Sequence, residues 1–174
     1  IYTNSASANT IKGNIIGAQA NGTAGLANTN GAGIPVQPYG ISISGSPNNI
    51  IGGAASANER NIISGNCIYG IFITGAAATG NTIKNNYIGP ASNGTALLSG
   101  LVDWETWQQY GIYVGSNSNI IGGTAANEGN VISGAGPSGG TGIGLGGNSN
   151  TVQGNMIGPA ANGTAFLTPY SDNN

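Results

Sequence analysis

Short apolar bursts separated by glycine and asparagine recur along the whole chain. They form three classes in a fixed order: a Gly-Ile-x-(Ile/Val/Leu) segment, an Asn with a β-branched pair, and a second Asn with an apolar pair. Each burst is too short for a helix and is bounded by Gly or Asn, so each predicts a strand of a few residues. The first class occupies 40–43, 70–73, 111–114 and 142–145; the second opens at Asn9, Asn49, Asn81, Asn119 and Asn150; the third opens at Asn14, Asn61, Asn86, Asn130 and Asn155.

The bursts belong to a long internal repeat. The segment 81–98, NTIKNNYIGPASNGTALL, recurs without a gap at 9–26 and 150–167, with starts 72 and 69 residues apart. A second unit, which opens with Tyr-Gly-Ile, lies between these copies at 39–66 and 110–134. Such a period determines the architecture, because each repeat is one structural unit that packs on its neighbours.

Three strands in a fixed order, repeated five times, describe a coil. Successive coils would stack like strands about 4.8 Å apart, with each side chain above its equivalent. The sequence therefore predicts an all-β fold, a parallel β-helix of about five coils with three short strands per coil. We expect a single domain over 1–174 with an irregular insertion at 99–109, and we interpret 1–3 as part of an incomplete first strand.

The connections alternate in length from coil to coil. In odd coils the two Asn positions lie five residues apart, whereas in even coils they lie 12 or 11 apart. The segment after the third strand shows the reverse, since it is long in the first and third coils and short in the second and fourth. The repeating unit is thus a pair of coils of about 71 residues.

The alignment places the ten asparagines in two stacked columns. An amide carries donors and an acceptor, so identical amides bond along a stack, and Asn tolerates the left-handed backbone of sharp corners. These features favour a structural role over ligand binding. Tyr39, Tyr69 and Tyr110, each just before a strand glycine, are expected to stack on one another or to cover a corner.

Charge and composition limit the possible partners. The chain has 33 glycines, no histidine, three basic and five acidic residues, and a net charge of −2. This balance provides no electrostatic footprint for nucleic acid or an anionic membrane, and no apolar run approaches the roughly 20 residues that span a bilayer. The chain begins at Ile1 rather than Met, so a cleaved signal before it stays open. Cys67 stands alone and is expected to be a small buried residue.

The runs IIGGAASANERNIISGN and NYIGPASNGTALL resemble the repeats of right-handed parallel β-helix proteins found on or outside bacterial cells. The resemblance covers nearly the whole chain except 99–109. It implies the right-handed, pectate-lyase-like form of the fold and an extracellular or cell-surface location. It does not imply one activity, because this architecture hosts pectin-degrading enzymes, phage tailspikes, adhesins and plain stalks.

The charged residues do not form a recognisable catalytic set. The resemblance implies clustered acids around Ca²⁺ for a lyase, or two or three converging carboxylates for a hydrolase. Only Asp103 and Glu105 lie close together in sequence, while Glu59 and Glu128 recur with the repeat and are interpreted as scaffold. Without histidine there is no visible nucleophile–base pair. We therefore predict no enzymatic activity, no cofactor and no metal site.

The insertion is the exception to the regular pattern, because it carries both tryptophans and two of the five acids. Aromatic faces beside acids and amides suit a sugar ring or a neighbouring subunit. Packing of the tryptophans on their own coil is the first interpretation, a subunit contact the second and carbohydrate binding the third. The residues concerned are Asp103, Trp104, Glu105 and Trp107.

The Asn-Gly-Thr triplets at Asn21, Asn93 and Asn162 satisfy the N-glycosylation pattern. Because Asn-Gly is also a good turn dipeptide, the matches can follow from the fold alone. We expect the triplets to be exposed on one face about 10 Å apart, which makes a stripe of glycans one hypothesis.

These inferences lead to one function and one alternative. The chain is expected to be a non-enzymatic extracellular structural protein, a subunit or segment of a filament, stalk or surface fibre whose copies associate head to tail. No partnership with nucleic acid and no membrane span are expected. The alternative is a β-helix domain that binds or degrades carbohydrate.

Overall fold

The computed structural model describes residues 1–26, 38–99, 108–135 and 140–167. Within them, fifteen short strands form three parallel sheets of five strands each. Each strand pairs with the equivalent strand of the neighbouring coil, three strands earlier or later in the chain. Strands β1, β2 and β3 therefore make coil 1, and the next three strands make coil 2. The first sheet contains β1 (Tyr2–Asn4), β4 (Tyr39–Ser44), β7 (Tyr69–Thr74), β10 (Tyr110–Val114) and β13 (Thr141–Leu145).

The other two sheets are built from shorter strands. The second contains β2 (Thr10–Ile11), β5 (Ile50–Ile51), β8 (Thr82–Ile83), β11 (Ile120–Gly122) and β14 (Thr151–Gln153). The third contains β3 (Ile15–Ile16), β6 (Ile62–Ile63), β9 (Tyr87–Ile88), β12 (Val131–Ile132) and β15 (Met156–Ile157).

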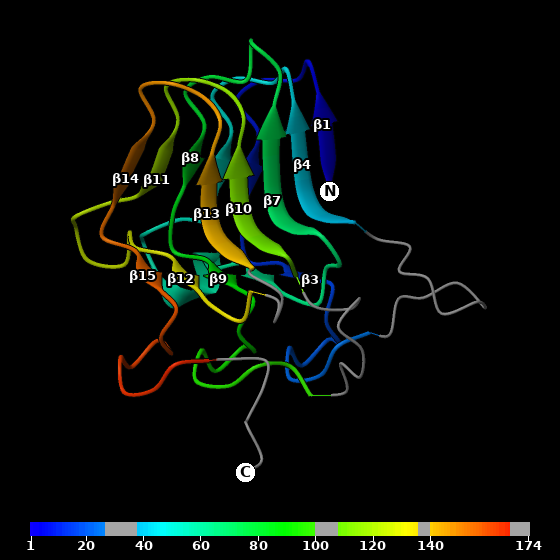
Figure 1. Cartoon of the computed structure of the whole chain (residues 1–174), viewed down its shortest axis with the longest axis vertical. Coiled ribbons are helices and arrows are strands. Elements are labelled where there is room, and N and C mark those ends of the chain that lie inside the picture. Colours follow the sequence, from blue (N-terminus) through cyan, green and yellow to red (C-terminus); the bar gives the residue numbers. More distant parts are fainter. Residues whose placement is uncertain (27–37, 100–107, 136–139, 168–174) are drawn as a thin grey trace.

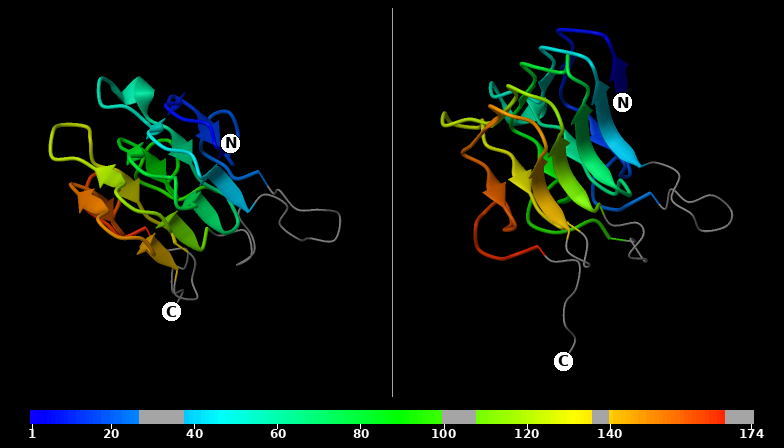
Figure 2. Two further views of the ribbon diagram at one scale, coloured as in Figure 1. Left: turned by 90° about the horizontal axis from the view of Figure 1, so that it is seen from above. Right: turned by 45° about the horizontal axis from the view of Figure 1, so that its top comes forward.

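The chain is therefore a parallel β-helix solenoid of five coils, as predicted. Figure 1 shows β1, β4, β7, β10 and β13 side by side, and Figure 2 shows the coils following one another from blue to orange. The short first strand is also confirmed, because β1 pairs with β4 in the register Tyr2↔Ser42. Coil 2 adds a 3-10 helix, Ala57–Glu59, in the long connection between β5 and β6.

The core lies inside the coils and consists of stacked aliphatic side chains. Along each strand the side chains alternate between the two faces, so Ile51 is completely buried while its neighbour Ile50 faces outward. Each inward residue lies above its equivalent, as in the register Ile41↔Ile71. The largest fully buried side chains are Ile41, Ile43, Ile51, Ile63, Ile71, Ile73, Ile83, Ile88, Ile112, Ile121, Ile132 and Val114.

Two columns of aromatic rings cover the outside of the first sheet. The predicted tyrosine stack is present, with ring centroids 5.6 Å apart for Tyr39 and Tyr69 and 4.9 Å for Tyr69 and Tyr110. A second column, which the repeat did not predict, pairs Phe72 with Tyr113, with ring centroids 5.6 Å apart. Burial raises the pKa of the Tyr69 phenol, which lies between two other rings.

No helix within the described ranges is long and apolar enough to cross a membrane.

Candidate functional site

The two asparagine columns are the most regular polar feature of the molecule, and they form as predicted. In all eight steps between neighbouring coils, the Nδ2 of one Asn donates to the Oδ1 of its equivalent at 2.8–3.3 Å. Asn49, Asn61, Asn81, Asn86 and Asn119 are fully buried. A buried amide that is hydrogen-bonded avoids the large cost of an unpaired polar group.

The hydrogen bonds of both columns run in one direction. Asn9 donates its main-chain N–H and its Nδ2 to the Oδ1 of Asn49, at 3.0 and 2.9 Å, and Asn49 donates in the same way to Asn81. The Oδ1 of each Asn consequently faces the preceding coil, and the donors of the ladder bonds face the following coil. The Nδ2 groups of Asn61, Asn86 and Asn130 donate in addition to a main-chain carbonyl of the preceding coil. On coil 1 the Oδ1 atoms of Asn9 and Asn14 therefore point away from coil 2.

The opposite polarity occurs on coil 5. The main-chain N–H groups of Asn150 and Asn155 face away from coil 4, and no described residue accepts from them. We define the coil-1 face by Asn9, Ile11, Asn14 and Ile16, and the coil-5 face by Asn150, Val152, Asn155, Ile157 and Phe166. The two faces carry complementary hydrogen-bonding groups.

The coil-5 face exposes core side chains that are covered elsewhere. Val152 and Ile157 retain 39% and 48% of their surface, whereas their coil-1 equivalents Ile11 and Ile16 retain 8% and 9%. Phe166 is the most exposed large apolar side chain among the described residues, at 76%. Exposed apolar side chains that lie together mark an interaction surface.

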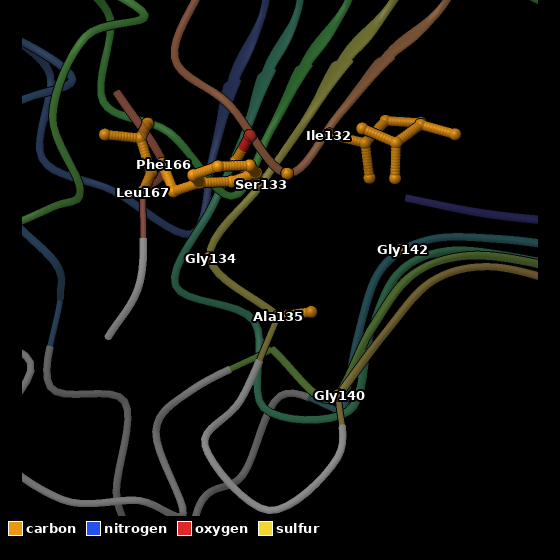
Figure 3. A pocket seen from close by; sticks show the side chains of 10 residues that line it. Ile132, Ser133, Gly134, Ala135, Gly140, Gly142, Phe166 and Leu167 are labelled. Atoms are coloured by element: carbon orange, nitrogen blue, oxygen red, sulfur yellow. The ribbon is translucent and has the colours of Figure 1, made fainter. Parts of the chain in front are cut away.

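A cavity of about 270 Å³ opens beside this face. Figure 3 shows the Phe166 ring at one side of it, next to Ser133, and Ile132 at the other. The lining is mostly apolar, and its Ser133 hydroxyl already donates to the Pro159 carbonyl at 2.6 Å. None of the described residues that line the cavity carries a group suited to acid–base chemistry.

The long connections after β3, β9 and β15 form a layer of stacked loops. Each loop is an antiparallel hairpin closed by one bridge: Ala18↔Gly25, Pro90↔Leu97 and Pro159↔Phe166. Successive hairpins bond directly to each other, because Ser92 N–H donates to the Gly22 carbonyl and Ala161 N–H to the Gly94 carbonyl, both at 2.8 Å. One hairpin therefore fills the height of two coils, and we call residues 17–26, 89–99 and 158–167 the loop layer.

The three Asn-Gly-Thr triplets form the turns of the loop layer. Asn21, Asn93 and Asn162 are exposed, and the Oδ1 of each accepts the main-chain N–H of the Thr two residues later at 3.0–3.1 Å. This local bond is typical of a turn in which Asn stabilises its own backbone.

Ion pairs form a third column, at the corner between the second and third sheets. Lys12 Nζ lies 2.6 Å from Glu59 Oε1, and Lys84 Nζ lies 3.5 Å from Glu128 Oε1. The Lys12 ammonium and the Ala55 main-chain N–H lower the pKa of the Glu59 carboxyl. Each pair joins an odd coil to the following even coil. The repeat predicted a scaffold role for Glu59 and Glu128 but not their pairing with lysines.

Arg60 lies at the same corner and is engaged by protein groups. Its guanidinium carbon lies 4.0 Å from the centroid of the Tyr87 ring, and its Nη2 donates to the Asn85 Oδ1 at 2.9 Å. A guanidinium held over a ring is attracted by the electrons of the aromatic face. The geometry gives Arg60 a structural role in joining coils 2 and 3.

The described residues contain no arrangement that supports hydrolysis or metal binding. No group of three or more acidic, histidine or cysteine side chains lies close enough to hold a metal ion within these ranges. Glu59 and Glu128 are separated by Lys84, and both are paired with lysine. The predicted contact residues Asp103, Trp104, Glu105 and Trp107 lie outside the described residues.

The aromatic columns also differ from a sugar-binding platform. Tyr69 has a ring stacked on each of its faces, with interplanar angles of 8° to Tyr39 and 22° to Tyr110. A sugar that stacks on an aromatic side chain needs an open ring face. The columns instead cover the outer surface of the first sheet.

Comparisons with known proteins make no assignment: no protein-family model matches the chain, and no curated protein and no solved structure matches it significantly. The solenoid architecture and the two coil faces are consequently the basis for any functional inference.

Proposed function

We propose that this chain is a non-enzymatic structural protein, a segment or subunit of an extracellular filament, stalk or surface fibre in which β-helices join end to end. The observation that carries the proposal is the one-way hydrogen bonding of the asparagine columns. Because the coil-1 face presents Oδ1 acceptors and the coil-5 face presents N–H donors, a head-to-tail joint continues both columns.

The polarity also selects among modes of association. Two coil-5 faces brought together would place donors against donors at Asn150 and Asn155. A head-to-tail joint is heterologous, and it propagates into a filament because it does not close. The apolar side chains Val152 and Ile157 would be buried in such a joint, which supplies the hydrophobic driving force.

The extracellular setting rests on the resemblance of the repeats to those of bacterial surface β-helix proteins. A glycan stripe on Asn21, Asn93 and Asn162 is part of the same proposal, and their exposure in the loop layer supports it. Intact-mass analysis of the protein from its natural source tests this part. The bare polypeptide mass would contradict glycosylation and leave the structural role untouched.

Assembly is tested on two chains by sedimentation velocity and electron microscopy. One is the 174-residue chain, and the other is residues 1–167 followed by a copy of 27–68, which adds a sixth coil of even type. Unbranched filaments of at least one of the two chains, with a fibre repeat of about 4.8 Å, are the expected result. Monomers of both chains at high concentration would contradict assembly through the coil faces.

A polysaccharide panel tests the alternative function. The chain is expected to release no product from acidic or neutral polysaccharides, because its described carboxylates form no converging pair. Turnover at ordinary enzymatic rates would overturn the structural proposal in favour of a carbohydrate-active domain.

A further inference from the structure

We propose that the coil-5 face is a docking surface for a coil of the even type, and that it does not accept coil 1 of a second copy directly. This inference rests on the proposed function, because it names the partner at the same joint. Coils 1, 3 and 5 are of the odd type, and coils 2 and 4 are of the even type. Only the even coils have a long connection between their second and third strands.

The molecule contains two examples of what covers an odd coil. Between coils 1 and 2, a Cβ built on Gly17 would lie 2.3 Å from the Ser64 carbonyl, and between coils 3 and 4, one on Gly89 would lie 1.8 Å from the Ser133 carbonyl. Only glycine permits this close approach of the following coil. The equivalent on coil 5, Gly158, has the same left-handed backbone but only the Phe166 ring within 4 Å.

Phe166 occupies a second position that an even coil covers. Its equivalent on coil 3, Leu97, packs on Gly134 of coil 4, where a Cβ would approach the leucine to 2.4 Å. On coil 5 no described residue covers the ring, which is 76% exposed. An even coil would place a glycine over Phe166 as coil 4 does over Leu97.

The ion-pair column has the same alternation. Odd coils carry Lys12, Lys84 and Gln153 at one position, and even coils carry Glu59 and Glu128 at the next. An even coil on the coil-5 face would place its glutamate next to Gln153. If a second copy followed, the glutamate would lie between Gln153 and the Lys12 of that copy. The order of polar groups along the corner would then be continued.

The loop layer obstructs the direct joint of two copies. Hairpins of odd coils occupy two coil heights, and they touch although one even coil separates the coils that carry them. Coil 1 of a second copy would lie one strand spacing of about 4.8 Å above coil 5. The loops 17–26 and 158–167 would then overlap, because neighbouring hairpins need two strand spacings between them. An intervening even coil restores the spacing seen twice in the molecule.

The test compares two extended chains with the 174-residue chain. The even-extended chain is residues 1–167 followed by copies of 27–38 and 39–68; the odd-extended chain has a copy of 69–98 in place of 39–68, and the two additions are equally long. We expect the even addition to raise the thermal midpoint by about 5 °C or more, and the odd addition to leave it unchanged or lower it. Hydrogen exchange at the N–H groups of Asn150 and Asn155 should slow only in the even-extended chain.

Substitution of Phe166 gives a second readout within the same chains. Phe166→Ala should lower the midpoint of the even-extended chain by about 5 °C and that of the 174-residue chain by less than about 1 °C, because only the former buries the ring. The matched control is Tyr2→Ala, which removes an exposed aromatic side chain on coil 1. It should change the thermal midpoints of the two chains by the same amount.

Equal midpoints for the two extended chains, or unchanged exchange at Asn150 and Asn155, would overturn the inference. The outcome is separable from that of the proposed function. An even-extended chain that is stabilised but stays monomeric supports the docking surface and contradicts filament assembly. Filaments of the 174-residue chain alone support assembly and contradict the need for an even coil.

Discussion

At the scale of single residues, asparagine both links neighbouring coils and stabilises the corner of its own coil. Its Nδ2 and Oδ1 continue the ladder between coils, and further Nδ2 bonds hold the corner of its own coil, as from Asn49 to the carbonyl of Ser46. Asn also tolerates left-handed backbone, which Asn48 and Asn85 adopt at φ 59° and 53°. A chain with few charges therefore obtains its specific polar contacts from amides.

Asn81→Leu should destabilise the fold by about 1–3 kcal/mol, because Asn49 and Asn119 would lose their shared partner inside the protein. Urea denaturation followed by circular dichroism measures the change. Asn58→Leu, at an exposed position, is the control and should change stability by less than about 0.5 kcal/mol. Equal effects of the two substitutions would show that the ladder contributes nothing specific.

The Lys12–Glu59 pair predicts a pH dependence of stability. Because folding lowers the pKa of Glu59 below its usual 4.5, the stabilisation is present above that pH and is lost as the pH falls through the folded pKa. Lys12→Met should therefore flatten the decline of the thermal midpoint between about pH 5 and pH 3. Gln153→Met, at the equivalent position of coil 5, is the control and should leave the decline unchanged.

At the scale of elements, the strands are short because each needs to contribute only one or two inward side chains per coil. The turn that follows decides how closely the next coil approaches. Gly52, after β5, has φ +84°, and a Cβ there would lie 1.9 Å from the Lys84 carbonyl of coil 3. The spacing of coils at this corner thus requires a residue without a Cβ atom at position 52.

Gly52→Ala should destabilise by more than about 2 kcal/mol, since it adds a clash with main chain to the cost of a left-handed alanine. Gly45→Ala is the matched control: its φ is +56°, but nothing lies within 4 Å of the added Cβ. We expect the control to cost only the backbone strain of about 1–2 kcal/mol. A control as damaging as Gly52→Ala in urea denaturation would contradict the close-approach explanation.

At the scale of the whole molecule, stability is a sum over coil-to-coil interfaces of two kinds, odd to even and even to odd. The strands of each coil pair only with those of the neighbouring coils, as in other solenoids, whereas the loop-layer hairpins bond to those two coils away. The loop layer makes the two kinds of interface different, because its hairpins span two coils. The smallest unit that can be inserted between existing coils without a mismatch is therefore a pair of coils.

Duplication experiments test this unit. A second copy of 39–109 inserted after Gln109 keeps the alternation and should raise the thermal midpoint. A second copy of 39–68 inserted after Ile68 places an even coil on an even coil and should lower it, although both insertions enlarge the core. Equal stabilisation by the two insertions would show that the coils are interchangeable.

The sequence by itself determined the number of coils, the three strands of each and the residues in both asparagine columns. These follow from a strict local period, since apolar bursts bounded by Gly or Asn allow one alignment and the alignment defines the stack. The tyrosine stack followed in the same way from Tyr39, Tyr69 and Tyr110. Position within the repeat was enough for all of these predictions.

Only the tertiary structure decided how equivalent positions meet across coils. The direction of the ladders, the pairing of Lys12 with Glu59 and the direct contact of the loop-layer hairpins depend on the offset of one coil relative to the next. That offset is set by main-chain hydrogen bonds, glycine contacts and side-chain packing between segments 25 or more residues apart. No local sequence pattern encodes it. The difference between the coil-1 and coil-5 faces arises from the same balance, and it became visible only once the coils were stacked.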